Sequence, residues 1–390
     1  MLKSIRWSAW SLAVLVLLPV GLAAQGFIYT NNDTKPNSIS AYYFGLDGSQ
    51  SQVSGQPFAT GGDGSGGGFY SSNRIIVVNN FLYASNSGSD TVSAYSIDPA
   101  SGFLTPVFGS PFSTAAFNDS SQSGISLAAT PDGKYLFAGS TGYDANFNPT
   151  PITIFSIDPT TGALTMTNKS TVPAGGPMSS MKVSPDGNYL LVVIPGSSEI
   201  AVFAIHGPGN LHEVHNSPYV LSSGAATSVD INCAGNLVFA GGTTGNIYAF
   251  NFSHGGLSPV AGSPYDTGKV SNRVVALSKD DNTLYSSNQS DNTVTAFTVD
   301  ANGVLVLAGS VNAGGTTGIQ PYPGGLAVSN DGTFLFSADL NSETSGYAGF
   351  SKFSLPTSSP IVFQSLTATV PATGFHSLAA YPAKACTPGP

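Results

Sequence analysis

Residues 82–98, LYASNSGSDTVSAYSID, and residues 284–300, LYSSNQSDNTVTAFTVD, are two copies of one pattern in a chain of 390 residues. Each copy has a short apolar segment, a polar stretch of Asn, Ser and Asp, and an alternating segment that ends at Asp. The polar stretch predicts a turn because these side chains bond to their own backbone. The alternation predicts a strand with two different faces. Two distant copies indicate an internal repeat, so the fold depends on the repeat period.

The same unit recurs along the whole chain. Its first strand begins near seven positions: Phe27, Phe81, Lys134, Asn188, Asn236, Thr283 and Thr333. Successive units are therefore 47–54 residues apart, and each contains about four predicted strands. This period and strand number are typical of a β-propeller blade. The sequence predicts an all-β, seven-bladed β-propeller.

Three sub-motifs keep the units in register. An aromatic residue in the alternating strand predicts packing between blades, at Tyr43, Tyr95, Phe155, Phe203, Phe250, Phe297 and Phe353. Proline-containing segments such as VFGSPF (107–112) and VAGSPY (260–265) fit an outer edge strand, where no backbone donor is needed. Turns such as TPDG (130–133) and SPDG (184–187) lead tightly into the next strand.

The two ends of the chain are predicted to share one blade. FIYT (27–30) fits a second strand, and SLAAYP (377–382) fits an innermost strand. One blade would then take three strands from the N-terminus and one from the C-terminus, which closes the ring and leaves no free sheet edge. We expect a propeller from 25 to 383, followed by a C-terminal tail from 384 to 390.

The N-terminus predicts export. Lys3 and Arg6 precede an apolar run over 9–20 and the sequence GLAAQ, which is the pattern of a secretory signal peptide over 1–24, cleaved after Ala24. The alternative is an uncleaved anchor, although the run is short for a membrane span. We expect a secreted or periplasmic protein that has no membrane association after cleavage.

Composition limits the partners. Only 8% of residues are charged, and the 46 Gly and 26 Pro favour turns and strands over helices. A net charge of −9 argues against a nucleic-acid surface, and we expect a monomer. Export permits a disulfide between Cys233 and Cys386, but spacing cannot establish one, so two unpaired thiols are the simpler expectation.

The repeats resemble a known type of propeller repeat. IYTNNDTKPNSISAY, LYASNSGSDTVSAY and LYSSNQSDNTVTAF are similar to the YVTN-type repeat. With the SPDG turns and the DPTTGAL corner (158–164), residues 26–383 resemble the seven-bladed lactonase-like family, which includes propeller-type 6-phosphogluconolactonases and carboxymuconate cycloisomerases. The resemblance implies the fold more firmly than the activity, because propellers carry many unrelated functions.

The resemblance also implies where chemistry would lie, and the chain departs from it there. Enzymes of the family carry His and Arg at the start of innermost strands, in stretches similar to G-P-H-x-H. The matching stretch in this chain, GPMSSM (176–181), has no histidine. The corresponding stretch of the sixth unit, PYPGG (321–325), has no basic residue.

Three other residues occupy matching strand starts. SNRII (72–76) and SNRVV (271–275) supply Arg74 and Arg273, and counting back from the last strand adds His376. We expect them at equivalent heights near one mouth of the central channel, with the arginines facing each other across it. Two guanidinium groups suit a substrate carboxylate or phosphate, and His376 suits proton transfer. The alternative is that each arginine pairs with a local Asp or a loop carbonyl.

The turns on the same face supply further candidates. Asn32, Asn86 and Asn288 lie in these turns, and we predict Asn86 and Asn288 to bind substrate, with turn formation as the alternative role. Asp339 and Glu343 are acidic and belong to the blade next to His376. We predict that they orient this histidine or accept its proton.

Other chemistry lacks support in the sequence. The chain has no serine-hydrolase elbow, P-loop or H-E-x-x-H motif. His206, His212 and His215 span a corner and an outer strand, so we expect a solvated surface and no metal site. Two functions remain open: a lactone hydrolase without metal or cofactor, acting on a lactone or related sugar acid, and a non-enzymatic propeller that binds a glycan, small ligand or protein through its loop face.

Overall fold

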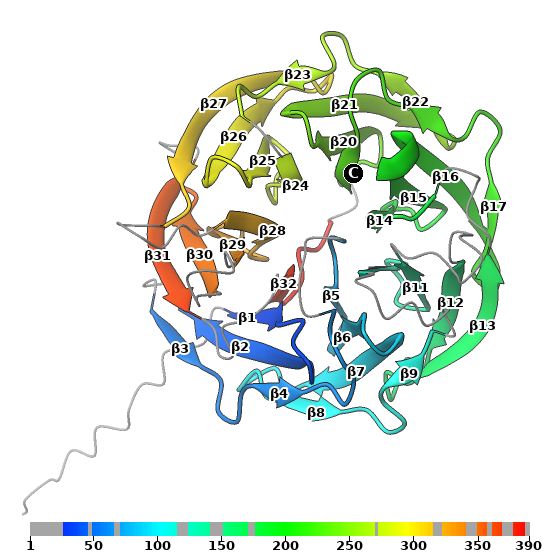
Figure 1. Cartoon of the computed structure of the whole chain (residues 1–390), viewed down its shortest axis with the longest axis vertical. Helices are drawn as coiled ribbons and strands as arrows, with labels where there is room; N and C mark the ends of the chain where they lie inside the picture. Colours follow the sequence, from blue (N-terminus) through cyan, green and yellow to red (C-terminus); the bar gives the residue numbers. More distant parts are fainter. Residues whose placement is uncertain are drawn as a thin grey trace, which may run out of the picture.

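The computed structural model describes residues 26–45, 49–65, 71–114, 124–140, 151–170, 176–269, 272–314, 322–340, 349–356, 361–368 and 377–386. These residues form seven antiparallel sheets arranged as blades around a central axis (Figure 1). The predicted seven-bladed, all-β propeller is confirmed. Within the described ranges, no helix has the length and apolar character needed to cross a bilayer. The predicted signal peptide lies outside them.

Each blade has an inner, a second, a third and an outer strand, and blades 1 to 7 follow one another around the ring. In that order, the inner strands are β32 (Ser377–Tyr381), β5 (Ile75–Val78), β10 (Ile125–Ala129), β14 (Ser180–Val183), β19 (Ala226–Ile231), β24 (Asn272–Leu277) and β28 (Tyr322–Val328). The second strands are β1 (Gly26–Asn31), β6 (Phe81–Asn86), β11 (Tyr135–Ser140), β15 (Tyr189–Ile194), β20 (Leu237–Gly242), β25 (Thr283–Asn288) and β29 (Phe334–Leu340).

The third and outer strands complete the blades. The third strands are β2 (Ser38–Phe44), β7 (Thr91–Ile97), β12 (Ile152–Ile157), β16 (Glu199–His206), β21 (Asn246–Ser253), β26 (Thr293–Val299) and β30 (Gly349–Ser354). The outer strands are β3 (Gln50–Gln52), β8 (Leu104–Pro106), β13 (Leu164–Ser170), β17 (Asn210–Glu213), β22 (Gly256–Pro259), β27 (Leu305–Asn312) and β31 (Val362–Ala368). A 3₁₀ turn, η1 (Pro195–Ser197), precedes β16.

The predicted closure of the ring is confirmed. The N-terminal strand β1 pairs with the C-terminal strand β32, with Phe27 opposite Tyr381 and Asn31 opposite Ser377. The strand that the sequence analysis places first in each unit is the second strand of a blade. All seven begin within one residue of the predicted positions. The repeat period therefore locates both the blades and their closure.

The aromatic stripe packs between blades as predicted, with one correction. Six of the seven residues are at most 2% exposed: Tyr95, Phe155, Phe203, Phe250, Phe297 and Phe353. In blade 1 the predicted residue, Tyr43, is wrong, because the register places Ala41 at the position of Ala94. Tyr42 is therefore the counterpart of Tyr95 and is 2% exposed, while Tyr43 is half-buried on the other side of the strand.

The proline-containing segments interrupt the outer edge instead of forming one continuous strand. After the proline the chain returns as a two-residue strand on the third strand, in blades 1, 2, 4 and 5: β4 (Phe58–Ala59), β9 (Phe112–Ser113), β18 (Tyr219–Val220) and β23 (Tyr265–Asp266). In blade 2, the Ala94 N–H donates to Ser110 Oγ at 2.9 Å in the gap. The serine before the proline thus satisfies a backbone donor that the broken ladder leaves open.

A glycine corner links neighbouring blades. Tyr83 of blade 2 donates its hydroxyl to the carbonyl of Gly162 in the DPTTGAL corner of blade 3, at 2.9 Å. Gly162 has φ +73°, and a Cβ there would lie 2.3 Å from the Phe81 ring. Only glycine fits both this backbone and this contact.

We expect Gly162→Ala to destabilise the propeller more than Gly187→Ala, by about 1–3 kcal/mol, because the added methyl overpacks the blade interface. Gly187 is a matched control: its φ is +74°, but the nearest contact of an added Cβ is 3.6 Å away, at Pro131. Equilibrium unfolding in urea measures both differences. Equal losses would show that backbone strain alone decides the effect.

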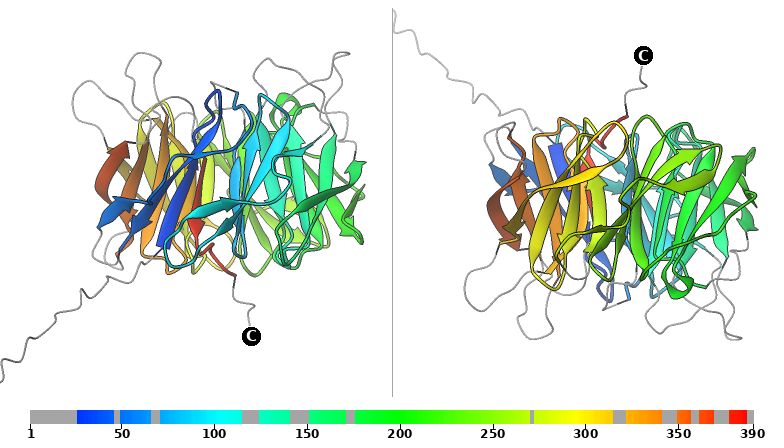
Figure 2. Two further views of the ribbon diagram at one scale, coloured as in Figure 1. Left: turned by 90° about the horizontal axis from the view of Figure 1, so that it is seen from below. Right: turned by 90° about the horizontal axis from the view of Figure 1, so that it is seen from above.

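The connections between strands separate onto two faces (Figure 2). The loop face carries the connections between blades and those between second and third strands, whereas the turn face carries the turns that follow inner and third strands. The C-terminal end lies on the turn face. The sequence predicts every candidate site residue on the loop face.

Residues 71–74, just before β5, run into the channel on its loop-face side. Ser72 N–H donates to Ser179 O of blade 4 at 2.8 Å, and Asn73 Nδ2 donates to Met181 O of the same blade at 3.1 Å. The Arg74 N–H donates to Ser377 Oγ of blade 1 at 3.1 Å. A segment of blade 2 that bonds to blades 1 and 4 occupies the channel at this level.

The two cysteines form a disulfide, so the expectation of unpaired thiols is wrong. Cys233 lies in the turn after β19, and Cys386 lies in the tail after β32. They are 153 residues apart in sequence, with Cα atoms 5.0 Å apart. The ring brings them together, and sequence spacing carries no trace of that proximity.

Candidate functional site

Arg74 is a buried ion-pair residue. It is 1% exposed, and its Nη1 lies 2.5 Å from Asp33 Oδ2, while its Nε donates to Ser71 O at 3.3 Å. Asp33 belongs to the connection between β1 and β2 and is 0% exposed. Its carboxylate also accepts the Ser65 N–H at 2.9 Å and the Ser65 hydroxyl. Arg74 thus pairs with a local Asp, which was the alternative to substrate binding in the sequence analysis. A role of Arg74 in substrate binding stays a prediction.

Sequence reasoning missed Asp33. The residue sits in NNDTKPN (31–37) with φ +53°, a context that predicts one more turn residue. The available signal was the scarcity of arginine: the chain has Arg6, Arg74 and Arg273 only. An arginine in the channel wall of such a chain needs a counter-ion nearby, because an unpaired buried charge is unfavourable.

The candidate asparagines cross-link strands. Asn86 is 0% exposed, and its Nδ2 donates to Thr91 Oγ1 at 2.9 Å and to Ser93 Oγ at 2.8 Å on the next strand. Asn288 makes the same two bonds to threonines of β26, at 2.9 and 2.8 Å. Asn32 bonds two serines of β2 in the same way. The amides therefore bind side chains of the next strand, not their own turn backbone, and substrate binding by Asn86 and Asn288 stays a prediction.

Asp339 takes this asparagine position in blade 7. Asp339 comes four positions after Leu335, and Asn288 comes four positions after Leu284. Leu335 lies opposite Phe353 of β30, just as Leu284 lies opposite Phe297 of β26, so the two positions correspond. Ser351, in the position of the Thr or Ser partner, donates its hydroxyl to Asp339 Oδ2 at 2.8 Å. The other oxygen, Oδ1, is buried and has no hydrogen-bond partner in the described part of the chain, and the residue is 2% exposed.

The environment of Asp339 favours the protonated form of its carboxyl group. Burial raises the pKa of Asp339 well above its ordinary value, because a carboxylate loses its hydration there. The hydrogen bond from Ser351 opposes this effect only in part. A buried carboxyl group of this kind lowers the stability of the fold, and such groups are common at sites of proton transfer.

Arg273 is out of register with Arg74. Its backbone lies in β24, where the register shifts between residues 272 and 274, so Val274 faces Ser287. In blade 2 the equivalent backbone position belongs to Arg74, whose carbonyl accepts the Ser85 N–H at 2.8 Å. Val274, not Arg273, is therefore the counterpart of Arg74. The prediction that the two arginines lie at equivalent heights is wrong by one residue.

The remaining candidates lie beyond the described ranges. Glu343 and His376 fall outside them, and the same holds for the side chain of Arg273. Their predicted roles stay predictions.

The stretch that resembles the family's histidine motif is built into the core. Met178 is 0% exposed and packs with Met181 in the apolar cluster between blades 3 and 4. Ser180, at the second histidine position, is also 0% exposed. A buried thioether cannot carry a proton, so this part of the inner strand holds no acid or base.

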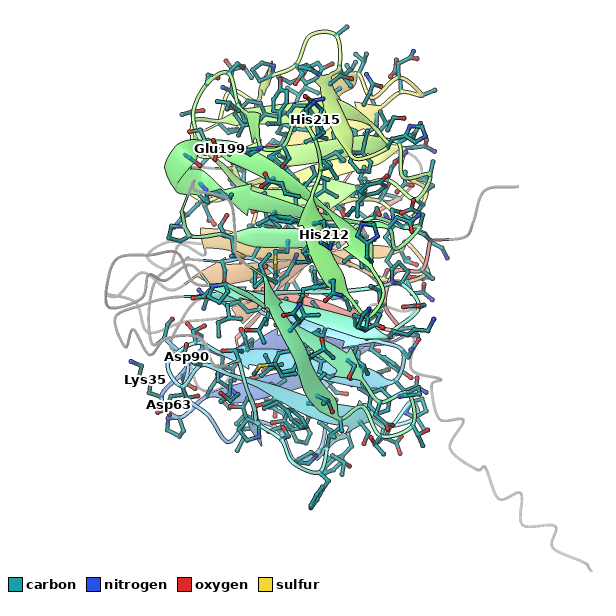
Figure 3. The ribbon with its side chains drawn as sticks, turned by 90° about the vertical axis from the view of Figure 1, so that its right-hand side faces the viewer. Lys35, Asp63, Asp90, Glu199, His212 and His215 are labelled. Carbon is teal, nitrogen blue, oxygen red and sulfur yellow. A yellow bond between two sulfur atoms is a disulfide. The ribbon has the colours of Figure 1, made fainter. Side chains whose placement is uncertain are left out.

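The three clustered histidines lie on the rim of blade 4. His206, His212 and His215 are exposed, as predicted, and the rings of His206 and His212 are in edge contact with centroids 5.2 Å apart. Figure 3 shows His212 and His215 on the outer rim, whereas Lys35 and Asp63 extend from the loop face. The histidine cluster is therefore separate from the candidate site.

A groove of about 470 Å³ opens on the turn face between blades 3 and 4. Tyr135, Ile205 and His206 line it together with the turns that contain Asp132 and Asp186. Both aspartates bond to their own turn residues. Among the predicted site residues that the structure describes, none borders this groove.

A comparison with family models decides the classification. The model described as Lactonase, 7-bladed beta-propeller, matches residues 70–179 and 247–347, which is more than half of the chain. The chain belongs to this lactonase propeller family. None of the curated proteins matches the chain.

Solved structures share the fold of this lactonase propeller at low sequence identity. The periplasmic gluconolactonase of Pseudomonas aeruginosa is 20% identical with a TM-score of 0.69, covering 93% of this chain and 99% of that chain. A proposed 6-phosphogluconolactonase from Bacteroides fragilis is 20% identical with a TM-score of 0.68 and the same coverage. Another from Bacteroides uniformis is 16% identical with a TM-score of 0.63, covering 91% and 99%. These similarities establish the fold.

Proposed function

We propose that this lactonase propeller hydrolyses the lactone of a sugar acid at the loop face, with Asp339 as the proton-transfer group. The single observation that carries the proposal is the buried Asp339 carboxyl, whose Oδ1 has no hydrogen-bond partner among the described residues, at a position where blades 1, 2 and 6 have an asparagine bonded to the next strand. Family membership and the lactonase names of similar structures support the substrate class.

The chemistry fits a carboxyl group whose pKa is raised by burial. Water adds to the lactone carbonyl carbon, the ring C–O bond breaks, and the leaving ring oxygen needs a proton to become a hydroxyl group. Asp339 would donate that proton, as a general acid with a raised pKa does. In this proposal Arg273 binds the acid group of the substrate, and Asn86 and Asn288 border the site. His376 and Glu343 take up the proton of the attacking water.

We place this activity outside the cytoplasm. The predicted signal peptide and the Cys233–Cys386 disulfide support an oxidising compartment. A phosphorylated cytosolic sugar acid is then an unsuitable substrate, and an unphosphorylated sugar lactone is preferred.

A second candidate function is ligand binding without catalysis. Met178 occupies a position where the resemblance to the family implies a histidine, and Arg74 forms a buried ion pair with Asp33. Both observations favour a propeller that retains the fold and binds a glycan, small ligand or protein through its loop face.

Proton release over a panel of sugar lactones tests the choice. We expect the mature protein to turn over at least one lactone, and Arg273→Ala to lose at least tenfold in kcat/KM because a charged anchor is removed. Lys279→Ala is the matched control, since it removes a cation from the turn that follows the same strand, on the opposite face; it should retain full activity. Absence of turnover on every lactone would reject hydrolysis and favour binding.

A further inference from the structure

The tail after β32 crosses the turn face. Figure 1 shows the segment after β32 running across the middle of the ring, and Figure 2 shows that it lies on the turn face. Contacts to three different blades hold it. They are Ala385 N–H to Asn330 Oδ1 of blade 7 at 3.4 Å, Lys384 Nζ to Asp281 Oδ1 of blade 6 at 3.0 Å, and the disulfide from Cys386 to Cys233 of blade 5.

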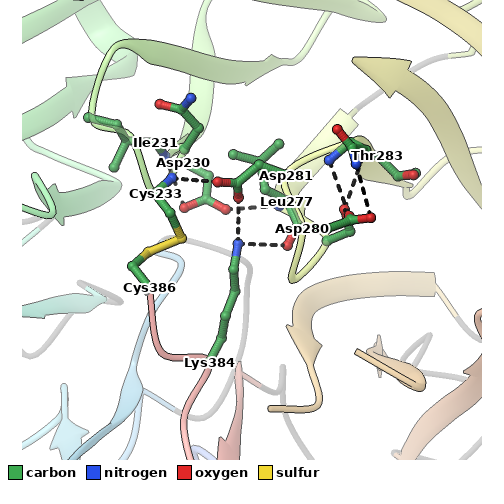
Figure 4. Close-up of polar contacts among 12 residues, drawn as sticks. Asp230, Ile231, Cys233, Leu277, Asp280, Asp281, Thr283, Lys384 and Cys386 are labelled. Atoms are coloured by element: carbon green, nitrogen blue, oxygen red, sulfur yellow. Dashed lines mark hydrogen bonds and ion pairs between the residues drawn. A yellow bond between two sulfur atoms is a disulfide. The ribbon is translucent and has the colours of Figure 1, made fainter. Parts of the chain in front are cut away.

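The anchors of the tail form one connected group (Figure 4). Asp281 accepts the tail ammonium of Lys384 with one oxygen and the Cys233 N–H with the other, at 2.6 Å. Lys384 Nζ also donates to Leu277 O at 3.3 Å. The ion pair and the disulfide therefore hold the same turn-face position.

Charged groups of the channel wall lie beside these anchors. Lys182 of β14 pairs with Asp230 of β19 at 2.8 Å, and Asp230 also accepts the Leu277 N–H of β24 at 2.9 Å. Burial would raise the pKa of Asp230, but the ammonium groups of Lys182 and Lys384 outweigh it and hold the pKa below its ordinary value. The tail lysine thus acts electrostatically on the channel wall.

We infer that residues 382–386 are a strap over the turn-face mouth of the channel, and that the Cys233–Cys386 disulfide is its redox-controlled latch. A dithiol reductant supplies two electrons and two protons, converts the disulfide to two thiols and is itself oxidised to a disulfide. The strap then keeps a partly exposed ion pair and two long hydrogen bonds, from Lys384 Nζ to Leu277 O and from the Ala385 N–H to Asn330 Oδ1, which hold a chain end weakly.

Release of the strap leaves the ring closed. β32 remains paired with β1 over five residue pairs, from Phe27–Tyr381 to Asn31–Ser377, and none of these involves the strap. Reduction therefore frees the chain after Tyr381 and further exposes Lys182 to the turn face, while the blades stay folded.

Limited trypsin digestion at 25 °C tests this inference on the mature protein, with and without dithiothreitol. Samples are quenched in acid and then fully reduced, so that loss of residues 385–390 by cleavage after Lys384 is counted in both states. We expect cleavage after Lys384 to be at least tenfold faster in the reduced protein, and Cys386→Ser to match the reduced rate without reductant. Acetylation of Lys182 by an amine reagent should rise in parallel.

Lys134 provides the internal control, because it lies on the turn face in blade 3 and is 70% exposed. Its cleavage and acetylation should be equal in both redox states. Equal cleavage after Lys384 in both states would overturn the inference, since the disulfide would then not hold the strap. A parallel rise at Lys134 would also overturn it, because the disulfide would then stabilise the whole propeller instead of latching one segment.

Discussion

Arg74→Met is expected to lower the free energy of unfolding by about 3–5 kcal/mol, as loss of one partner of a buried ion pair does. The substitution removes the cation from the Asp33 carboxylate, which is 0% exposed, and leaves it, among the described residues, the hydrogen bonds from Ser65. A methionine fills the space of the arginine stem but supplies no charge. Urea-induced equilibrium unfolding of the oxidised protein measures the loss.

Two further variants separate this charge effect from packing. Asp33→Asn in the Arg74→Met background removes the unpaired charge and keeps an acceptor for the Ser65 N–H. The double variant should therefore lose clearly less than the sum of the single variants. Lys134→Met breaks the exposed pair with Asp132, whose members are 70% and 49% exposed, and should change stability by less than about 1 kcal/mol. Additive losses in the double variant would contradict a coupled buried pair.

The importance of this pair follows from the path of the chain. Arg74 ends the segment that crosses the channel, and Asp33 holds it from blade 1. The same interaction fixes the start of β5 and fills the channel on its loop-face side. We therefore regard the pair as part of ring assembly, which makes Arg273 the better anion-binding candidate of the two arginines.

The architecture was predictable because its determinants are local. Polar turns, alternating strands and Asp-Gly corners recur within each unit, so the period revealed the number of blades and their boundaries. Even the closure of blade 1 followed from the incomplete units at the two ends, FIYT and SLAAYP.

Register and long-range pairing were not predictable in the same way. A strand pattern cannot distinguish Tyr42 from Tyr43 when both are aromatic, and a single extra residue at Arg273 shifts a matched motif by one. The ion pair of Asp33 and the disulfide join residues that only the closed ring brings together. Such contacts have no local signal in the chain.

The sequence analysis selected Asp339 as a site residue because it is acidic and belongs to the blade next to His376. The structure supports the same residue through its position in the repeat. Asp339 occupies the position that Asn288 has in blade 6. An alignment of ADL (338–340) with SNQ (287–289) would have shown this correspondence. In blades 1, 2 and 6 that amide donates two hydrogen bonds. A carboxyl group can donate one at most, and only when protonated.

Asp339→Asn is expected to reduce lactone turnover by about 10²–10⁴-fold, the usual contribution of a general acid or base. The same substitution should stabilise the protein by about 1–3 kcal/mol near neutral pH, because it removes a buried group whose ionisation is unfavourable. The new amide can donate to Ser351, as Asn288 donates to Thr295. Proton release and urea unfolding measure the two effects. Asp331→Asn is the control, since it removes a carboxylate from the turn-face end of the same blade and should keep full activity.

The pH dependence separates this account from simple damage to the site. The folded-state pKa of Asp339 is raised, so between the ordinary carboxyl pKa of about 3.9 and that raised value the folded protein holds more protons than the unfolded chain. Stability therefore falls as pH rises through this range, and the penalty persists above it. The stability advantage of Asp339→Asn should accordingly grow as pH rises from about 4 to that raised pKa. Wild-type kcat should fall as pH rises through the same raised pKa, because the proton donor is lost. A stability advantage that is constant with pH, or a loss of stability in the variant, would show that Asp339 does not carry a buried, protonated carboxyl group.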